Sequence, residues 1–199
     1  MQKINGFVRR LPAWPIYIVS VAWFGWLFWQ ALSGAMGPDP VNALELALGT
    51  LALQLMVALL AITPARKYLG LNLIKFRRAL GLAVFFFVAM HLGVWMILDV
   101  QFLGQVLNDL VKRPFITIGM ASFVLMVPLA LTSNNLSIRR LGPQAWNKLH
   151  KLTYAVVILG AAHNVLIQKT WETEPLVYLG IIAALLVMRI KWRPFMATA

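Results

Sequence analysis

The sequence predicts an all-α integral membrane protein, built as a bundle of six transmembrane helices. Of its 199 residues, 61% are hydrophobic and only 12% are charged, and the mean hydropathy is +0.78. Soluble domains carry about 25% charged residues, so this chain has too few to cover a globule in water. The apolar content is enough for six spans of about 20 residues each. No linker, internal repeat or low-complexity tract is visible, so we expect a single domain over residues 1–199.

Six stretches with almost no charge mark the expected helices in chain order. We place these helices at about 11–35, 46–65, 79–98, 114–135, 150–168 and 175–191. The first four stretches have the length of about 17–25 residues that a span requires, and the fifth just reaches it. The last stretch is short, and we expect Arg189 and Lys191 to extend it by turning their charged ends toward the interface.

Basic residues gather in alternate connections between these helices. Fifteen of the 18 lysines and arginines, and none of the six acids, lie at the N-terminus, in 66–78, in 139–151 and in the tail. The other three cations and all six acids lie in the remaining connections. The positive-inside rule therefore predicts that both termini are cytoplasmic. Because topology accounts for the net charge of +12, we expect contact with membrane lipid and none with nucleic acid.

The chain has three histidines, and two of them lie inside expected spans. His91 and His163 lie at similar depth in the outer halves of the 79–98 and 150–168 helices. Two neutral imidazoles that face each other across a bundle provide the axial ligands of a six-coordinate haem iron. Small residues beside them, such as Ala89, Gly93 and Gly160, leave room for a porphyrin. The sequence thus predicts a haem held between the third and fifth helices; the alternatives are interhelical hydrogen bonds or a proton relay.

His150 lies 13 residues before His163, about 20 Å lower along a helix, at the cytoplasmic interface. It is a candidate second haem ligand, and the alternative is an interfacial histidine in a basic loop. Thirteen residues are about 3.6 turns, so an ideal helix would not present both imidazoles on one face.

Several kinds of chemistry are excluded by what the chain lacks. It has no cysteine, which excludes disulfides, thiolate-held iron–sulfur clusters and covalent c-type haem attachment. No glycine-rich nucleotide fingerprint or P-loop occurs. We therefore expect the chain to receive electrons from another molecule, and to have no substrate-reducing site of its own.

The outer connection 99–113 predicts an amphipathic helix in the membrane interface. Its apolar stripe consists of Phe102, Leu103, Val106, Leu107, Leu110 and Val111, and the opposite face carries Gln101, Gln105, Asn108 and Asp109. Such a helix is either a docking surface for a partner or a plain surface connector.

Several motifs, in this order and at this spacing, resemble one known family. They are 37–41 (GPDPV), 62–64 (ITP), 77–82 (RRALGL), 113–119 (RPFITIG), 131–133 (LTS) and 146–154 (WNKLHKLTY). The chain resembles the MsrQ family, the haem-binding membrane subunits of the periplasmic methionine sulfoxide reductase system. That family belongs to the transmembrane superfamily of ferric reductases and NADPH oxidases.

The resemblance implies a haem b cytochrome, with one or two haems, in the bacterial inner membrane. It implies that electrons pass to a periplasmic molybdenum-cofactor reductase, which repairs oxidised methionines. The donor that it implies is the quinone pool or a cytosolic flavin reductase, with FMN as an associated cofactor. The alternative functions are a stand-alone ferric or oxygen reductase and a histidine-based proton-relay transporter.

One position departs from the pattern of the superfamily. Its larger members carry a second histidine 13–14 residues before the one that matches His91, and here Arg77 and Arg78 occupy those positions. A guanidinium is a poor iron ligand but a good partner for an anion. We expect these arginines to hold an anionic group of a flavin or quinone beside His150. The other arrangement is a haem at His150 with an unusual or vacant sixth position.

Overall fold

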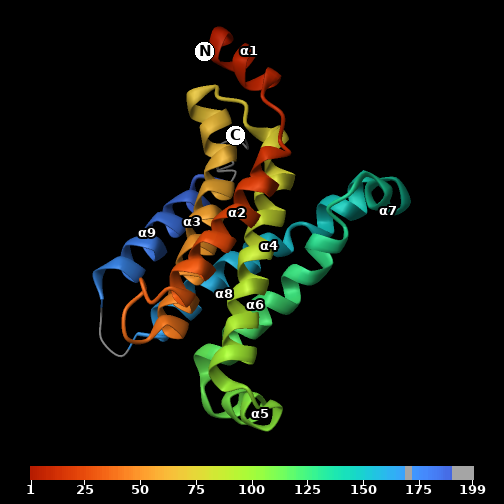
Figure 1. Cartoon of the computed structure of the whole chain (residues 1–199). Coiled ribbons are helices and arrows are strands. Elements are labelled where there is room, and N and C mark those ends of the chain that lie inside the picture. Colours follow the sequence, from red (N-terminus) through yellow and green to blue (C-terminus); the bar gives the residue numbers. More distant parts are fainter. Residues whose placement is uncertain (169–171, 190–199) are drawn as a thin grey trace.

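The structure is a computed structural model that describes residues 1–168 and 172–189, most of which are helical (Figure 1). Lys169, Lys191 and Arg193, which entered the charge analysis, lie outside the described residues, as do the last two residues of the expected 175–191 helix. The elements in order are α1 (Gln2–Arg10), α2 (Pro15–Leu32), α3 (Pro40–Leu69), the 3₁₀ turn η1 (Ile74–Phe76), α4 (Arg77–Val94), the π-helical η2 (Trp95–Val100), α5 (Leu103–Lys112), α6 (Pro114–Leu131), α7 (Asn135–Leu149), α8 (Leu152–Leu166) and α9 (Thr173–Val187).

Four helical segments in the described part are long and apolar enough to cross a membrane. They are Pro15–Leu32, Pro40–Leu69, Ile74–Val100 and Pro114–Leu131. The helices α8 and α9 are apolar but have 15 residues each. At 1.5 Å per residue they reach about 22 Å, less than the hydrocarbon thickness of about 30 Å. The all-helical membrane class is thus confirmed, and the count of six spans stays a prediction.

Local signals explain where the long helices begin and end. Proline occupies the first turn of α2, α3 and α6, where its missing N–H costs no helical hydrogen bond. The Asp39 side chain accepts from the backbone N–H of Asn42 and caps α3. Gly70, at φ 66°, ends α3 in the left-handed conformation that glycine adopts without strain. As a result α3 is longer at both ends than the expected 46–65 helix.

Side-chain bonds join the segments at one end of the bundle. Asn5 Nδ2 donates to Gly70 O at 2.9 Å, and Lys75 Nζ donates to Arg9 O at 2.9 Å. Tyr68 Oη contacts Met188 O at 3.5 Å, which brings the end of α9 to the same place. We call this the basic end: it comprises α1, residues 66–78 and α7. The opposite end, with residues 33–39 and α5, is called the acidic end (Figure 1).

The helix α7 lies where the sequence analysis expected a loop. The expected 114–135 helix was too long, because α6 ends at Leu131 and a new helix begins at Asn135. The Asn134 side chain caps this helix by accepting from Ser137 N at 2.8 Å. Gly142, at φ 75°, bends α7 just before Pro143.

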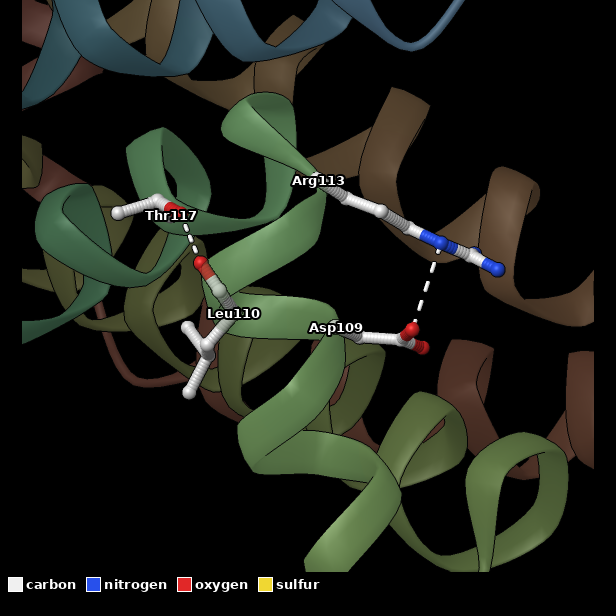
Figure 2. A network of polar contacts seen from close by, with 4 residues as sticks. All are labelled: Asp109, Leu110, Arg113 and Thr117. Atoms are coloured by element: carbon white, nitrogen blue, oxygen red, sulfur yellow. Dashed lines mark hydrogen bonds and ion pairs between the residues drawn. The ribbon is translucent and has the colours of Figure 1, made fainter.

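The helix α5 turns a mixed face toward the bundle. Val106 and Asp109 are buried, whereas Leu103, Leu107 and Val111 of the predicted apolar stripe are exposed. Asp109 therefore lies on the buried face, where the Arg113 Nε atom is 3.4 Å from its carboxylate (Figure 2). The larger part of the apolar stripe, with Phe102, Leu103, Leu107 and Val111, faces outward, as suits a helix in contact with lipid or a partner.

Candidate haem site

Two histidines face each other across the middle of the bundle. His91 comes from α4 and His163 from α8, and their ring centres lie 6.2 Å apart with the ring planes at 80°. Both line a cavity of about 410 Å³, a size within the usual range of about 300–1,000 Å³ for ligand pockets. The sequence analysis placed these residues at similar depth, and the structure brings them together.

Each of the two rings is held by a backbone carbonyl of a neighbouring helix. His91 Nδ1 lies 2.9 Å from Glu45 O in α3, and His163 Nδ1 lies 2.7 Å from Phe115 O in α6. A carbonyl oxygen only accepts, so each Nδ1 carries the hydrogen and donates it. Nε2 of each neutral ring then keeps its lone pair. This is the arrangement of metal-binding histidines, whose second nitrogen commonly donates to a carbonyl.

The separation of the rings would allow both imidazoles to bind one metal ion between them. A metal–nitrogen distance of about 2 Å on each side, with each nitrogen about 1.1 Å from its ring centre, places the centres roughly 6 Å apart. The observed separation is 6.2 Å. Within residues 1–168 and 172–189, no group of three or more His, Cys, Asp or Glu side chains is placed to hold a metal ion.

The walls of the cavity have an apolar part and a polar part. Apolar side chains such as Leu53, Met56 and Phe123 form one part of the lining, which also includes Gly160. Polar and charged residues cluster toward the acidic end: they are Asn42, Glu45, Asp99, Arg113 and Asn164. An apolar macrocycle suits the apolar part of the lining. Asn42, Arg113 and Asn164 carry hydrogen-bond donors for its carboxylate substituents, whereas ionised Glu45 and Asp99 would repel them.

Two glycines that the sequence analysis did not single out for this site lie against the histidine rings. A Cβ atom on Gly119 would come 2.7 Å from His163 Nδ1, and one on Gly49 would come 3.3 Å from His91 Nδ1. Gly93, which was expected to make room for the porphyrin, has nothing within 4 Å of its Cβ position. The close glycines belong to α3 and α6, so neither is near its histidine in sequence.

His150 lies apart from this cavity, at the junction of α7 and α8. Its Nε2 is 3.1 Å from Thr132 Oγ1, and its ring stacks on Trp146 with centres 3.8 Å apart. Trp146 Nε1 in turn donates to Thr132 O at 2.8 Å. Burial, followed by the positive charge of Arg77, lowers the pKa of His150 below its ordinary value.

The two arginines at the start of α4 have different surroundings. Arg78 donates to Asn135 Oδ1 of α7 at 2.8 Å. Arg77 lies close enough to His150 and Arg189 for their charges to interact. Arg189 donates to Leu60 O at 2.5 Å. Arg77 is thus near enough to His150 for its charge to lower the pKa of that histidine, and Arg78 is bonded to α7.

Comparisons with known proteins identify related chains. Residues 46–161 match the family described as ferric reductase like transmembrane component. The protein-methionine-sulfoxide reductase heme-binding subunit MsrQ of Brucella anthropi is 46% identical over 178 residues, which cover 89% of this chain and 80% of the relative. The protein of the same name from Brucella ovis is 43% identical over 193 residues, covering 95% of this chain and 87% of the relative. No solved structure shows significant similarity to the chain.

Proposed function

Because the chain belongs to the ferric-reductase-like transmembrane family, and within it to the MsrQ heme-binding subunits, we propose that it binds haem b between His91 and His163. In this role it carries electrons across the bacterial inner membrane to a methionine sulfoxide reductase. The whole chain acts as one transmembrane domain. The observation that carries the proposal is the pair of imidazoles, 6.2 Å apart, each with Nδ1 bonded to a carbonyl.

The protein residues have three tasks at this site. His91 and His163 would hold the iron through Nε2, and the carbonyls of Glu45 and Phe115 fix the tautomer and the ring orientation. The apolar walls exclude water from the macrocycle. Bound haem b supplies one-electron redox chemistry, with a potential that depends on its axial ligands, their hydrogen bonds and burial.

The charge distribution gives the direction of transfer. The elements of the basic end carry most of the cations of the chain, so under the positive-inside rule this end faces the cytoplasm, with both termini. The haem cavity lies toward the acidic end, since Glu45, Asp99 and Arg113 line it. Electrons therefore leave toward the periplasm, where the acceptor is a molybdenum-cofactor reductase that repairs oxidised methionines.

The donor site lies at the basic end. Arg77, with Arg78 and His150 nearby, faces an anionic group of the donor, which is a quinol of the membrane pool or the FMN of a cytosolic flavin reductase. The interaction of Arg77 with Arg189 supports this assignment, because two guanidinium groups near each other favour an anion.

Replacing the ligands tests the function. His91→Ala and His163→Ala each remove one axial bond, so both purified variants should lose most of their bound haem, measured by absorption and pyridine haemochrome. His163→Gly should regain a six-coordinate low-spin spectrum when imidazole is added, which separates loss of a ligand from misfolding. Full haem content and an unchanged spectrum in both alanine variants would contradict the proposal.

A further inference from the structure

His91 and His163 are each held by a backbone carbonyl and a glycine of a neighbouring helix. His91 bonds to the carbonyl of Glu45 and lies against Gly49, and His163 bonds to the carbonyl of Phe115 and lies against Gly119. In both helices the glycine stands four residues after the residue whose carbonyl accepts. The two sites use different helices, with α3 holding the ligand of α4 and α6 holding the ligand of α8.

The spacing of four residues has a physical reason. In an α-helix the carbonyl of residue i accepts from the N–H of residue i+4, so these two groups are adjacent on the helix surface. Helical side chains lean toward the N-terminus and cover the turn before their own Cα. A side chain at i+4 therefore covers the carbonyl of residue i. Glycine at i+4 leaves that carbonyl accessible to a second donor from a neighbouring helix.

We propose that Gly49 and Gly119 are positioning residues for the haem, each exposing one helix carbonyl to the Nδ1–H of a ligating histidine. This inference rests on the proposed haem site and assigns how the ligands are oriented there. The glycine admits the ring, the carbonyl fixes the hydrogen on Nδ1, and Nε2 is thereby aimed at the iron. His150 has no such arrangement, because its Nε2 faces a hydroxyl group.

The distances predict that replacing glycine by alanine has a larger effect at Gly119 than at Gly49. A Cβ on Gly119 would lie 2.7 Å from Nδ1 and 2.9 Å from Cε1 of His163. The ring must then leave its place, and with it the bond to Phe115 O. A Cβ on Gly49 would lie 3.3 Å and 3.4 Å from the same two atoms of His91. There a shift of a few tenths of an ångström relieves the contact and only lengthens the bond to Glu45 O.

The experiment compares Gly119→Ala, Gly49→Ala and the control Gly180→Ala. Gly180 belongs to α9 and is not among the residues that line the cavity, and a Cβ there has nothing within 4 Å. The measurements on the purified protein are haem content, the spin state from the visible spectrum, and the midpoint potential. Gly119→Ala should lose most of its haem or convert it from low-spin to high-spin. Gly49→Ala should keep its haem with a raised midpoint potential, since donation from Nδ1–H makes a histidine ligand more basic and favours the ferric state.

Gly180→Ala should match the parent in all three measurements. Parental haem content, spin state and potential in Gly119→Ala would overturn the proposal. If Gly119→Ala yields no folded protein, the potential of Gly49→Ala decides, and an unchanged value overturns the proposal. The proposed function is tested separately: it fails only if His91→Ala and His163→Ala retain their haem. This inference can fail while those two variants still lose their haem.

Discussion

The hydroxyl of Thr132 lies 3.1 Å from Nε2 of His150 and donates its own hydrogen to Pro128 O at 2.6 Å. Since the hydroxyl hydrogen is already used, Thr132 accepts from His150, and the hydrogen of the neutral ring is on Nε2. This tautomer is the opposite of the one at His91 and His163, where Nδ1 donates to a carbonyl. The three histidines of the chain therefore have two different hydrogen-bonding arrangements, and only His91 and His163 present a free Nε2.

Replacing His150 tests this difference. Because its Nε2 donates to Thr132, we expect His150→Gln to retain the haem content and low-spin spectrum of the parent. Haem per protein is measured by pyridine haemochrome in matched preparations. A fall to about half the parental haem would show instead that His150 ligates a second haem.

Neutralising the arginines of α4 should separate their roles. Arg77→Gln removes the charge beside His150, so reduction of the haem by a quinol or a reduced flavin should slow at least several-fold, with the haem spectrum unchanged. Arg78 is bonded to Asn135, and Arg78→Gln should have the smaller effect.

The measurement is stopped-flow reduction of the purified protein, with Arg66→Gln as a control cation of the basic end. Equal rates in the parent and in Arg77→Gln would show that Arg77 serves only membrane topology.

Replacing Arg113 should lower the thermal stability of the corner between α5 and α6 more than replacing Asp109 does. The Asp109 side chain is 8% exposed and that of Arg113 is 54% exposed, with 3.4 Å between Nε and the carboxylate (Figure 2). Removing the arginine leaves a buried carboxylate without its partner, which costs about 1–3 kcal/mol. Removing the carboxylate leaves a guanidinium that water can solvate.

We therefore expect Arg113→Ala to lower the thermal midpoint more than Asp109→Asn does, as measured by scanning fluorimetry in detergent. The reverse order would show that Arg113 is not the group that stabilises Asp109.

The sequence analysis found the histidine pair because ionisable residues inside spans are rare and their depth can be counted from the loops. It could not find Gly49 and Gly119, since their role depends on which carbonyl of a neighbouring helix each ring reaches. It missed α7 because the segment is basic and contains Gly142-Pro143, a pair typical of turns. The sequence analysis placed Asp109 on the polar face of the amphipathic helix. It could not show that Asp109 is buried beside Arg113, because Arg113 follows the end of that helix.

The short helix α8 provides the sharpest test of the topology. It has 15 residues, yet six spans require it to cross the membrane, with local thinning of the bilayer to match its length. If α8 crosses, Arg139 in α7 and Glu172 at the start of α9 lie on opposite sides. Both residues are exposed, and the chain has no cysteine, so a single introduced thiol reports its own side.

We expect a membrane-impermeant maleimide to label Glu172→Cys in intact spheroplasts and to label Arg139→Cys only after the membrane is permeabilised. Val111→Cys, on the exposed face of α5, is the matched control for the outer side. The positive-inside rule gives this assignment, because Arg139 lies among the cations of the basic end. Protection of both Arg139→Cys and Glu172→Cys, with Val111→Cys labelled, would show that α8 does not span the bilayer. The segments before and after α8, which carries His163, would then lie on the same side of the membrane.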